Sequence, residues 1–280
     1  ISGMKITLAD GKIKDFDEAV TAKAVAVSIS TVLAKSAVAV RVNGNLCDLS
    51  TNLCDGDQVV FVKAGDPEAL EVLRHSAAHL MADAILRLYP KAQLTIGPVV
   101  EDGFYYDIYL PEGKITPEDF PKIEKQMKHL SKKSLAFKRF CSSYDQADEH
   151  YQRYQQIDGG NNKFKQEIVA QIKEKQEQLS FYQHGDFIDL CRGPHVPHSG
   201  WLKYSKLLRV SGSYWRADAE REPLTRVYGT AFFNKEDLDE YLNFLQESKK
   251  RDHRILGEKL DLFSFSEDAP GFPFSFPREL

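Results

Sequence analysis

Two histidines, His75 and His79, stand four residues apart in a stretch whose pattern predicts a helix. Residues four apart lie on one face of a helix, so the two imidazoles can converge on one small site. The apolar stripe of the same helix consists of Leu70, Leu73, Ala77, Leu80, Met81, Ala84 and Leu88. At about 100° per residue the histidines fall opposite that stripe. This weakens the ordinary alternative of a hydrogen-bonded core histidine, and the pair predicts acid–base or metal chemistry.

A second pair, Cys191 and His195, has the same spacing but lies in a different kind of segment. Gly193 and Pro194 stand between them and prevent a regular helix, so we expect a loop that follows a strand. Loops held by a rigid scaffold commonly carry reactive groups. The alternatives are a small buried cysteine and a histidine exposed on a surface loop.

Together the two pairs offer three imidazoles and one thiol, a donor set that suits tetrahedral zinc. A zinc peptidase of the H-E-x-x-H type is disfavoured, because Ser76 stands where the general-base glutamate would be. The remaining interpretation is a hydrolytic site for an ester or an amide, working with or without a metal.

The elements that must position these residues fall into two groups, of which the first fills about sixty residues. Its strands are predicted over residues 4–8, 12–16, 38–42, 46–49 and 59–62, with a helical segment within 19–35. Asp10-Gly11 and Asn43-Gly44 are turn pairs that tolerate positive φ, so each joins two strands into a hairpin. Two hairpins around one helix predict a β-grasp domain.

The second group mixes helices and strands, and it contains both candidate pairs. Helices are predicted over residues 68–88, 117–133 and 234–250, a strand over 186–190, a loop over 191–200 and a polar Gly/Asn-rich break over 157–162. The fold class is therefore α+β, with an N-terminal β-grasp domain, a larger α+β domain and then a linker helix.

Composition narrows the setting of the protein. The 280 residues are 42% hydrophobic, which allows two compact cores. The net charge of −4 gives no global signal for nucleic-acid binding. Basic residues do cluster within 122–139 and 249–254, where a solvated helix face is the alternative. Four cysteines without framework spacing suit a reducing compartment, and no apolar run is long enough for a membrane. We therefore expect a cytoplasmic protein with no membrane partner.

Several motifs resemble those of threonyl-tRNA synthetases of the bacterial type. They are residues 74–80 (RHSAAHL), 96–98 (IGP), 102–107 (DGFYYD), 189–196 (DLCRGPHV), 212–216 (GSYWR), 226–231 (RVYGTA), 250–254 (KRDHR) and 269–271 (APG). The resemblance implies a TGS (β-grasp) domain over 1–64, an editing domain over 65–233, a linker helix over 234–256 and the truncated start of a class II catalytic domain over 257–280.

By this resemblance, the chain hydrolyses the ester of mischarged seryl-tRNA(Thr). Serine differs from threonine by one methyl group, which yields only ~1–3 kcal/mol of discrimination, so a second, proofreading pocket is needed. The implied catalytic residues are His75, His79, Cys191 and His195, and the implied substrate-binding residues are Lys165 and Asp189. We expect an activated water to attack without a metal; zinc held by the four catalytic side chains and a covalent Cys191 are alternatives.

The resemblance also implies partners and a parent enzyme. The partners are tRNA(Thr) and seryl-tRNA, with a monomer expected for this stretch and a homodimer for the full-length parent. That parent would attach threonine to tRNA(Thr) with ATP, magnesium and zinc, none of which this stretch is expected to bind. Two other functions stay open: a zinc-dependent deacylase of the alanyl type, and a non-catalytic module that binds tRNA or regulates.

Overall fold

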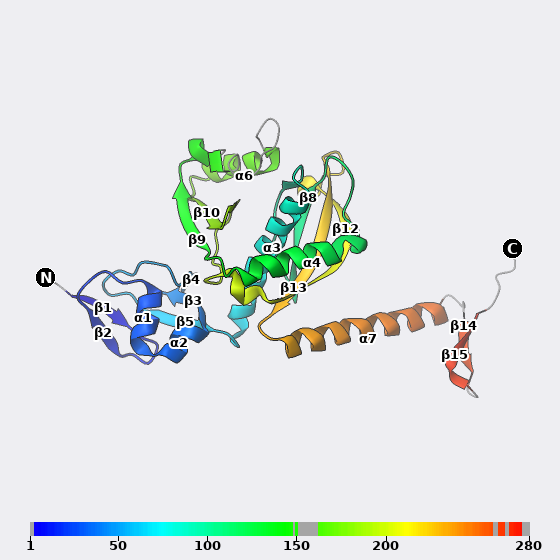
Figure 1. The fold of residues 1–280 in the computed structure, drawn as a ribbon, viewed down its shortest axis with the longest axis horizontal. Helices are drawn as coiled ribbons and strands as arrows, with labels where there is room; N and C mark the ends of the chain where they lie inside the picture. The colour runs from blue at the N-terminus through cyan, green and yellow to red at the C-terminus, as the bar shows by residue number, and fades with distance from the viewer. Residues whose placement is uncertain (1–2, 148, 151–161, 260–262, 267–268, 276–280) are drawn as a thin grey trace. The chain divides into compact units, whose positions relative to one another are not determined.

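The computed structural model describes residues 3–147, 149–150, 162–259, 263–266 and 269–275 (Figure 1). Its contacts divide the chain into two compact units, residues 1–233 and 234–280. The expected polar break at 157–162 lies outside the described residues except for Asn162, as do parts of the expected catalytic-domain start. Within the described part of the chain, no helix combines the length and the apolar character that crossing a membrane requires.

The N-terminal domain has the β-grasp arrangement that its sequence predicts. One antiparallel hairpin pairs β1 with β2, and a second sheet has the order β4-β3-β5. A parallel bridge joins Thr7, at the end of β1, to Gln58, the residue before β5, and so links the hairpin to the second sheet. The elements are β1 (Met4–Thr7), β2 (Ile13–Phe16), α1 (Ala22–Ile29), α2 (Thr31–Ser36), β3 (Ala37–Val42), β4 (Asn45–Cys47) and β5 (Val59–Lys63).

The single helical segment expected within 19–35 is two helices instead. Ser30 stands between α1 and α2 in an extended conformation, with φ −165° and ψ 154°. Its backbone N–H donates to Ala26 O of the first helix, while its side chain accepts from Leu33 N of the second. Ser30 therefore ends α1 and caps α2. Its side-chain hydrogen bond to the backbone competes with a continuous helix, and the pattern of apolar residues does not show this.

The larger domain places a long helix, α3 (Pro67–Leu88), against a sheet of order β12-β13-β8-β6, with β7 paired to β8 (Figure 1). A second sheet has the order β11-β10-β9. The remaining elements of this domain are β6 (Gln93–Leu94), β7 (Val99–Val100), β8 (Gly103–Tyr109), α4 (Phe120–Lys132), β9 (Lys138–Ser142), α6 (Lys163–Glu174), β10 (Leu179–His184), β11 (Phe187–Leu190), β12 (Tyr204–Tyr214) and β13 (Pro223–Phe232). Short 3-10 helices lie at Pro117–Asp119, Tyr144–Gln146, Ser199–Leu202 and Trp215–Ala217.

Helix α3 is enclosed on all sides rather than on one stripe. From Leu73 to Leu86 every residue except the half-buried His75 is buried. One hydrophobic core extends from Val38 and Val62 of the β-grasp sheet across this helix to the strands of the larger domain, while a second core lies within the β-grasp domain. The polar residues on α3 are therefore held inside the protein, where each needs a partner.

The second unit consists of α7 (Lys235–Lys259) and a hairpin of β14 (Phe263–Ser266) and β15 (Ala269–Ser275). The helix begins one residue after the predicted start at 234 and continues beyond both predicted ends, by nine residues past 250 and by three past 256. Its acidic first turn, with Glu236 and Asp237, favours the helix N-terminus through the backbone dipole.

Candidate functional site

The candidate loop begins directly after β11 and is anchored to the neighbouring strand β10. The backbone N–H of Cys191 donates to Ser180 O at 3.1 Å, and the Ser180 hydroxyl donates back to Cys191 O at 2.7 Å. A third contact, from Gly193 N to Cys191 Sγ at 3.2 Å, curls the loop around the sulfur. The loop expected from Gly193 and Pro194 is thus present, and its cysteine is held by the sheet.

The two predicted pairs meet in one cluster. Cys191 Sγ lies 3.2 Å from His75 Nε2 and 3.3 Å from His195 Nε2. The ring centroids of His79 and His195 are 4.4 Å apart, and those of His75 and His79 are 5.4 Å apart. One turn of α3 therefore presents both of its histidines to the loop, as the four-residue spacing requires.

The tautomer of His195 follows from the bonds of Ser76. The Ser76 hydroxyl has one proton, and it donates that proton to Val72 O at 2.8 Å. Its oxygen also accepts from Val196 N at 3.0 Å and lies 3.0 Å from His195 Nδ1. Since the proton of Ser76 is already committed, Nδ1 of His195 must be the donor. The bare Nε2 then faces Cys191, where it can accept a proton or bind a metal.

Burial keeps the cluster uncharged at neutral pH. Desolvation lowers the pKa values of His75 and His195 and lowers the pKa of His79 to about 3. Desolvation also raises the pKa of the Cys191 thiol to about 12. Both effects disfavour the charged form of a group removed from water. The cluster is therefore three neutral imidazoles around a protonated thiol.

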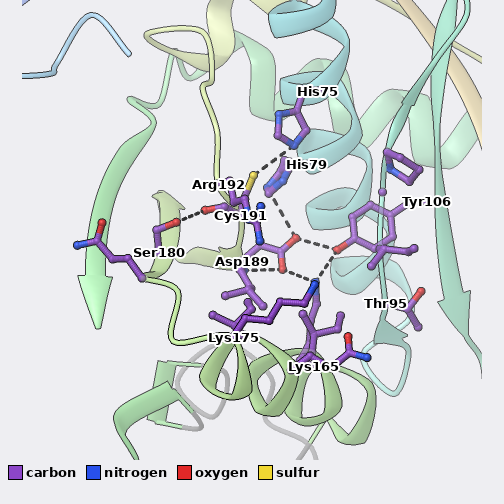
Figure 2. Close-up of a pocket in the computed structure, with 18 residues that line it drawn as sticks. His75, His79, Thr95, Tyr106, Lys165, Lys175, Ser180, Asp189, Cys191 and Arg192 are labelled. Atoms are coloured by element: carbon purple, nitrogen blue, oxygen red, sulfur yellow. Dashed lines mark hydrogen bonds and ion pairs between the residues drawn. The ribbon is translucent and has the colours of Figure 1, made fainter. Parts of the chain in front are cut away.

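A buried charged network lies beside this neutral cluster, as Figure 2 shows. Lys165 Nζ lies 2.8 Å from Asp189 Oδ1, and the Tyr106 hydroxyl donates to Asp189 Oδ2 at 2.8 Å. Burial acts to raise the pKa of Asp189, but the Lys165 charge and these hydrogen bonds hold it below its usual value. His79 Nδ1 lies 3.7 Å from Asp189 Oδ2 and so joins the two halves of the site.

The position of Lys165 depends on the capping of α6. Asn162 caps this helix by accepting from the backbone N–H groups of Phe164 and Lys165, both at 3.1 Å. Its amide also donates to Leu94 O at 2.8 Å, which ties the start of the helix to β6. A positive charge in the first turn opposes the helix dipole. The helix dipole therefore disfavours the charge of Lys165 at this position, and the ion pair with Asp189 offsets that cost.

A pocket of about 380 Å³ opens onto both halves of the site. Five of the six predicted site residues line it: His75, His79, Lys165, Asp189 and Cys191. His195 does not line this pocket; it is buried behind Cys191, where its exposed fraction is 2%. The other lining residues are Thr95, Ile96, Gly97, Pro98, Tyr106, Ile168, Gln171, Ile172, Lys175, Gln178, Ser180, Leu190 and Arg192.

Sequence reasoning assigned no role to Tyr106 or Ser76, although both lie in the quoted motifs. Lys165 Nζ donates to the Tyr106 hydroxyl oxygen at 3.1 Å, so this hydroxyl completes a triangle with the ion pair. Alternation along β8 places Tyr106 on one face of the sheet. Nothing in the sequence shows that Asp189, 83 residues away, lies against that face.

The four-residue cluster also fits a metal ion. One ligand atom from each of His75, His79, Cys191 and His195 can be chosen so that all lie within 4.8 Å of one another. Zinc accepts such nitrogen and sulfur donors at about 2.0–2.3 Å in a tetrahedron. The bond from His195 Nδ1 to Ser76 supplies the outer support that a metal-binding imidazole usually has. These residues could therefore hold zinc as Lewis acid without a change in tautomer at His195.

Two family models match the sequence, each over part of the chain. Residues 4–63 match the TGS domain, and residues 179–228 match the threonyl and alanyl tRNA synthetase second additional domain. The second match contains Asp189, Cys191 and His195 but not the histidines of α3. The loop of the candidate site thus lies within the stretch that is similar to a domain of threonyl and alanyl tRNA synthetases.

Curated relatives extend the match to almost the whole chain. It is 50% identical to the threonine–tRNA ligase of Desulfatibacillum aliphaticivorans over 275 residues, which cover 98% of the chain and 41% of that protein. The chain is homologous to threonine–tRNA ligases. It is 44% identical to the ligase of Carboxydothermus hydrogenoformans and 47% identical to that of Coxiella burnetii, again over 98% of its length. It spans about two fifths of the length of these relatives.

We expect Cys191 to resist alkylation at pH 8, because its thiol pKa of about 12 leaves little thiolate. The exposed Cys54 and Cys141 are internal controls. With iodoacetamide and peptide mass spectrometry, Cys191 should be modified at least ~10²-fold more slowly than either. Labelling of Cys191 as fast as the controls would contradict a neutral cluster and would favour a nucleophilic cysteine.

Proposed function

We propose that this chain hydrolyses the ester bond of seryl-tRNA(Thr), as the proofreading part of a threonyl-tRNA synthetase. The observation that carries the proposal is the pocket in which neutral imidazoles stand beside the Asp189–Lys165 pair. Homology to threonine–tRNA ligases supplies the substrate class. An aminoacyl ester carries a cationic amine, a carbonyl that becomes negative during attack, and an oxygen leaving group, and the pocket has a complement for each.

The charged half of the pocket suits recognition. The Asp189 carboxylate can accept hydrogen bonds from the serine ammonium group. Lys165 Nζ can donate to the serine hydroxyl or to the oxyanion that develops on the carbonyl. The Tyr106 hydroxyl gives its one proton to Asp189 and so holds that carboxylate in place. Because the three groups are locked to one another by hydrogen bonds at 2.8–3.1 Å, they need little rearrangement when the substrate arrives.

The neutral half suits proton transfer. A water molecule attacks the ester carbonyl carbon and gives a proton to the imidazole of His75, which lines the pocket and is the least buried of the three histidines. The bond to the ribose oxygen then breaks, and that oxygen takes up a proton, leaving serine and free tRNA(Thr). The protonated Cys191 and the buried His195 orient His75 rather than react. Their neutrality also leaves the imidazole free to accept the proton.

Selectivity against threonine requires a wall that does not yield to one methyl group. Gly97 lines the pocket, and a Cβ on it would lie 2.3 Å from the Tyr106 ring. The Gly97 backbone is therefore packed directly on an aromatic side chain that Asp189 and Lys165 hold. We infer that this rigid corner rejects the threonine methyl group by displacing the ester from the attacking water.

The wider assignments are also proposals. We propose that the full-length parent is a cytoplasmic homodimer that attaches threonine to tRNA(Thr) with ATP, magnesium and zinc. The stretch described here would be a monomer that recognises tRNA(Thr) without membrane contact.

Single-turnover deacylation of seryl-tRNA(Thr) and threonyl-tRNA(Thr) tests the proposal. We expect the plateau rate with the serine ester to be at least ~10²-fold higher, because a displacement of about 1 Å costs that much. Equal plateau rates would refute the steric account, and a difference confined to half-saturation would assign selectivity to binding. A chain that binds tRNA(Thr) but hydrolyses neither ester would be a binding module.

A zinc-dependent deacylase is the second candidate, favoured by the four clustered donor atoms. We expect the purified chain to work without zinc, because Asp189 and Lys165 already supply the electrostatic contacts that a Lewis acid would provide. Elemental analysis of protein prepared without chelator, together with deacylation before and after chelation, decides between the two. Near-stoichiometric zinc that is lost together with activity would establish the zinc-dependent alternative.

A further inference from the structure

A carboxylate from the β-grasp domain reaches the site loop of the larger domain. Asp48 lies directly after β4, within the segment that matches the TGS domain. Its Oδ1 accepts from the backbone N–H of His195 at 2.8 Å, and its Oδ2 accepts from the Tyr182 hydroxyl at 2.5 Å. Both donors belong to the larger domain and lie more than 130 residues away in sequence. The contact thus connects two domains at the candidate site.

Tyr182 carries this contact to the rest of the loop. It lies on β10 directly opposite Asp189 of β11, so it shares the sheet that holds the charged network. Its ring meets the His195 ring edge to face, with centroids 4.4 Å apart. A Cβ on Gly193 would lie only 1.8 Å from the Tyr182 hydroxyl oxygen, so the loop passes directly over that oxygen. The position of the Tyr182 hydroxyl, which Asp48 holds, therefore sets the path of the loop at Gly193.

A buried carboxylate such as Asp48 costs folding free energy that a purely structural contact would not require. Its exposed fraction is 9%, and burying a carboxylate costs free energy that its hydrogen bonds only partly recover. An apolar residue would fill a domain boundary at lower cost. Asp48 instead fixes geometry, because its one carboxylate holds both the His195 backbone and the Tyr182 hydroxyl in place.

We propose that Asp48 is a positioning residue for the deacylation site, so that the β-grasp domain completes the site of the larger domain. Ser76 fixes the ring of His195 through Nδ1, and Asp48 fixes its backbone. The two supports together aim His195 Nε2 at Cys191 Sγ. The inference rests on the proposed function, since it assigns a role within that site.

The test compares Asp48→Ala and Asp48→Asn with the wild-type chain in single-turnover deacylation of seryl-tRNA(Thr). We expect Asp48→Ala to lower the plateau rate by ~10²-fold, the cost of a displacement of about 1 Å, with half-saturation within about twofold of wild type. Asp48→Asn should stay within about tenfold, because its amide oxygen still accepts from His195 N–H and its NH₂ group can donate to the Tyr182 oxygen.

Val25→Ala is the matched control, since Val25 is fully buried in the β-grasp core and does not touch the site. It should lower the unfolding temperature but leave the plateau rate unchanged. Hydrogen exchange of the His195 amide, followed by NMR, reads the contact independently of catalysis. Its protection should be lost in Asp48→Ala and kept in Val25→Ala.

The outcomes separate this inference from the proposed function. An inactive wild-type chain refutes the proposed function and, with it, any role of Asp48 in deacylation. An active wild type with Asp48→Ala at the wild-type rate, or with Asp48→Ala and Val25→Ala equally slow, overturns the role of Asp48 alone. If Asp48→Ala does not fold, Tyr182→Phe replaces it: a rate about tenfold below wild type supports the inference, and an unchanged rate overturns it.

Discussion

The buried ion pair between Lys165 and Asp189 is the interaction on which the rest of the site depends. Their side chains are only 4% and 2% exposed, and neither charge could remain there alone. The pair joins α6 to β11, and the Tyr106 hydroxyl brings in β8, so three elements from distant parts of the chain meet at one triangle (Figure 2). The wall of the pocket is therefore set by this pair.

The pair also explains the division of the pocket into charged and neutral halves. Because its two charges cancel, the Lys165–Asp189 pair offers a fixed donor and a fixed acceptor to a substrate without adding net charge to the pocket. Beside it, burial lowers the pKa of His79 to about 3 and raises that of Cys191 to about 12, so the cluster stays neutral across the physiological range. The His79 imidazole stands 3.7 Å from Asp189 and remains neutral beside that carboxylate. In the proposed function, substrate recognition would use the charged Lys165–Asp189 pair, and proton transfer would use the neutral imidazoles beside it.

The sequence contained most of the site but little of what holds it in place. The four-residue spacings placed His75 with His79 and Cys191 with His195, and the turn pairs and alternating strands indicated the β-grasp fold correctly. Those signals are local, arising from helix geometry and backbone preferences.

The parts that could not be predicted are long-range contacts. Tyr106 meets Asp189 across 83 residues, and Asp48 meets His195 across 147. The apolar stripe of α3 placed His75 and His79 opposite the core, whereas the β-grasp sheet and the larger domain bury the helix all round from Leu73 to Leu86. The spacing of apolar residues within one helix does not show which of its faces another domain will bury.

Under the proposed function, the Lys165–Asp189 pair serves the chemistry of the site and adds little to the stability of the fold. A double-mutant cycle with Lys165→Met, Asp189→Leu and the combined variant tests it, with urea unfolding and single-turnover deacylation measured on each. Each single change should destabilise the chain by ~3–5 kcal/mol, because it leaves one buried charge unpaired, and the combined variant should regain most of that loss. The combined variant should nevertheless show no deacylation of seryl-tRNA(Thr). A combined variant that stays active, or whose loss of stability equals the sum of the single losses, would contradict the account.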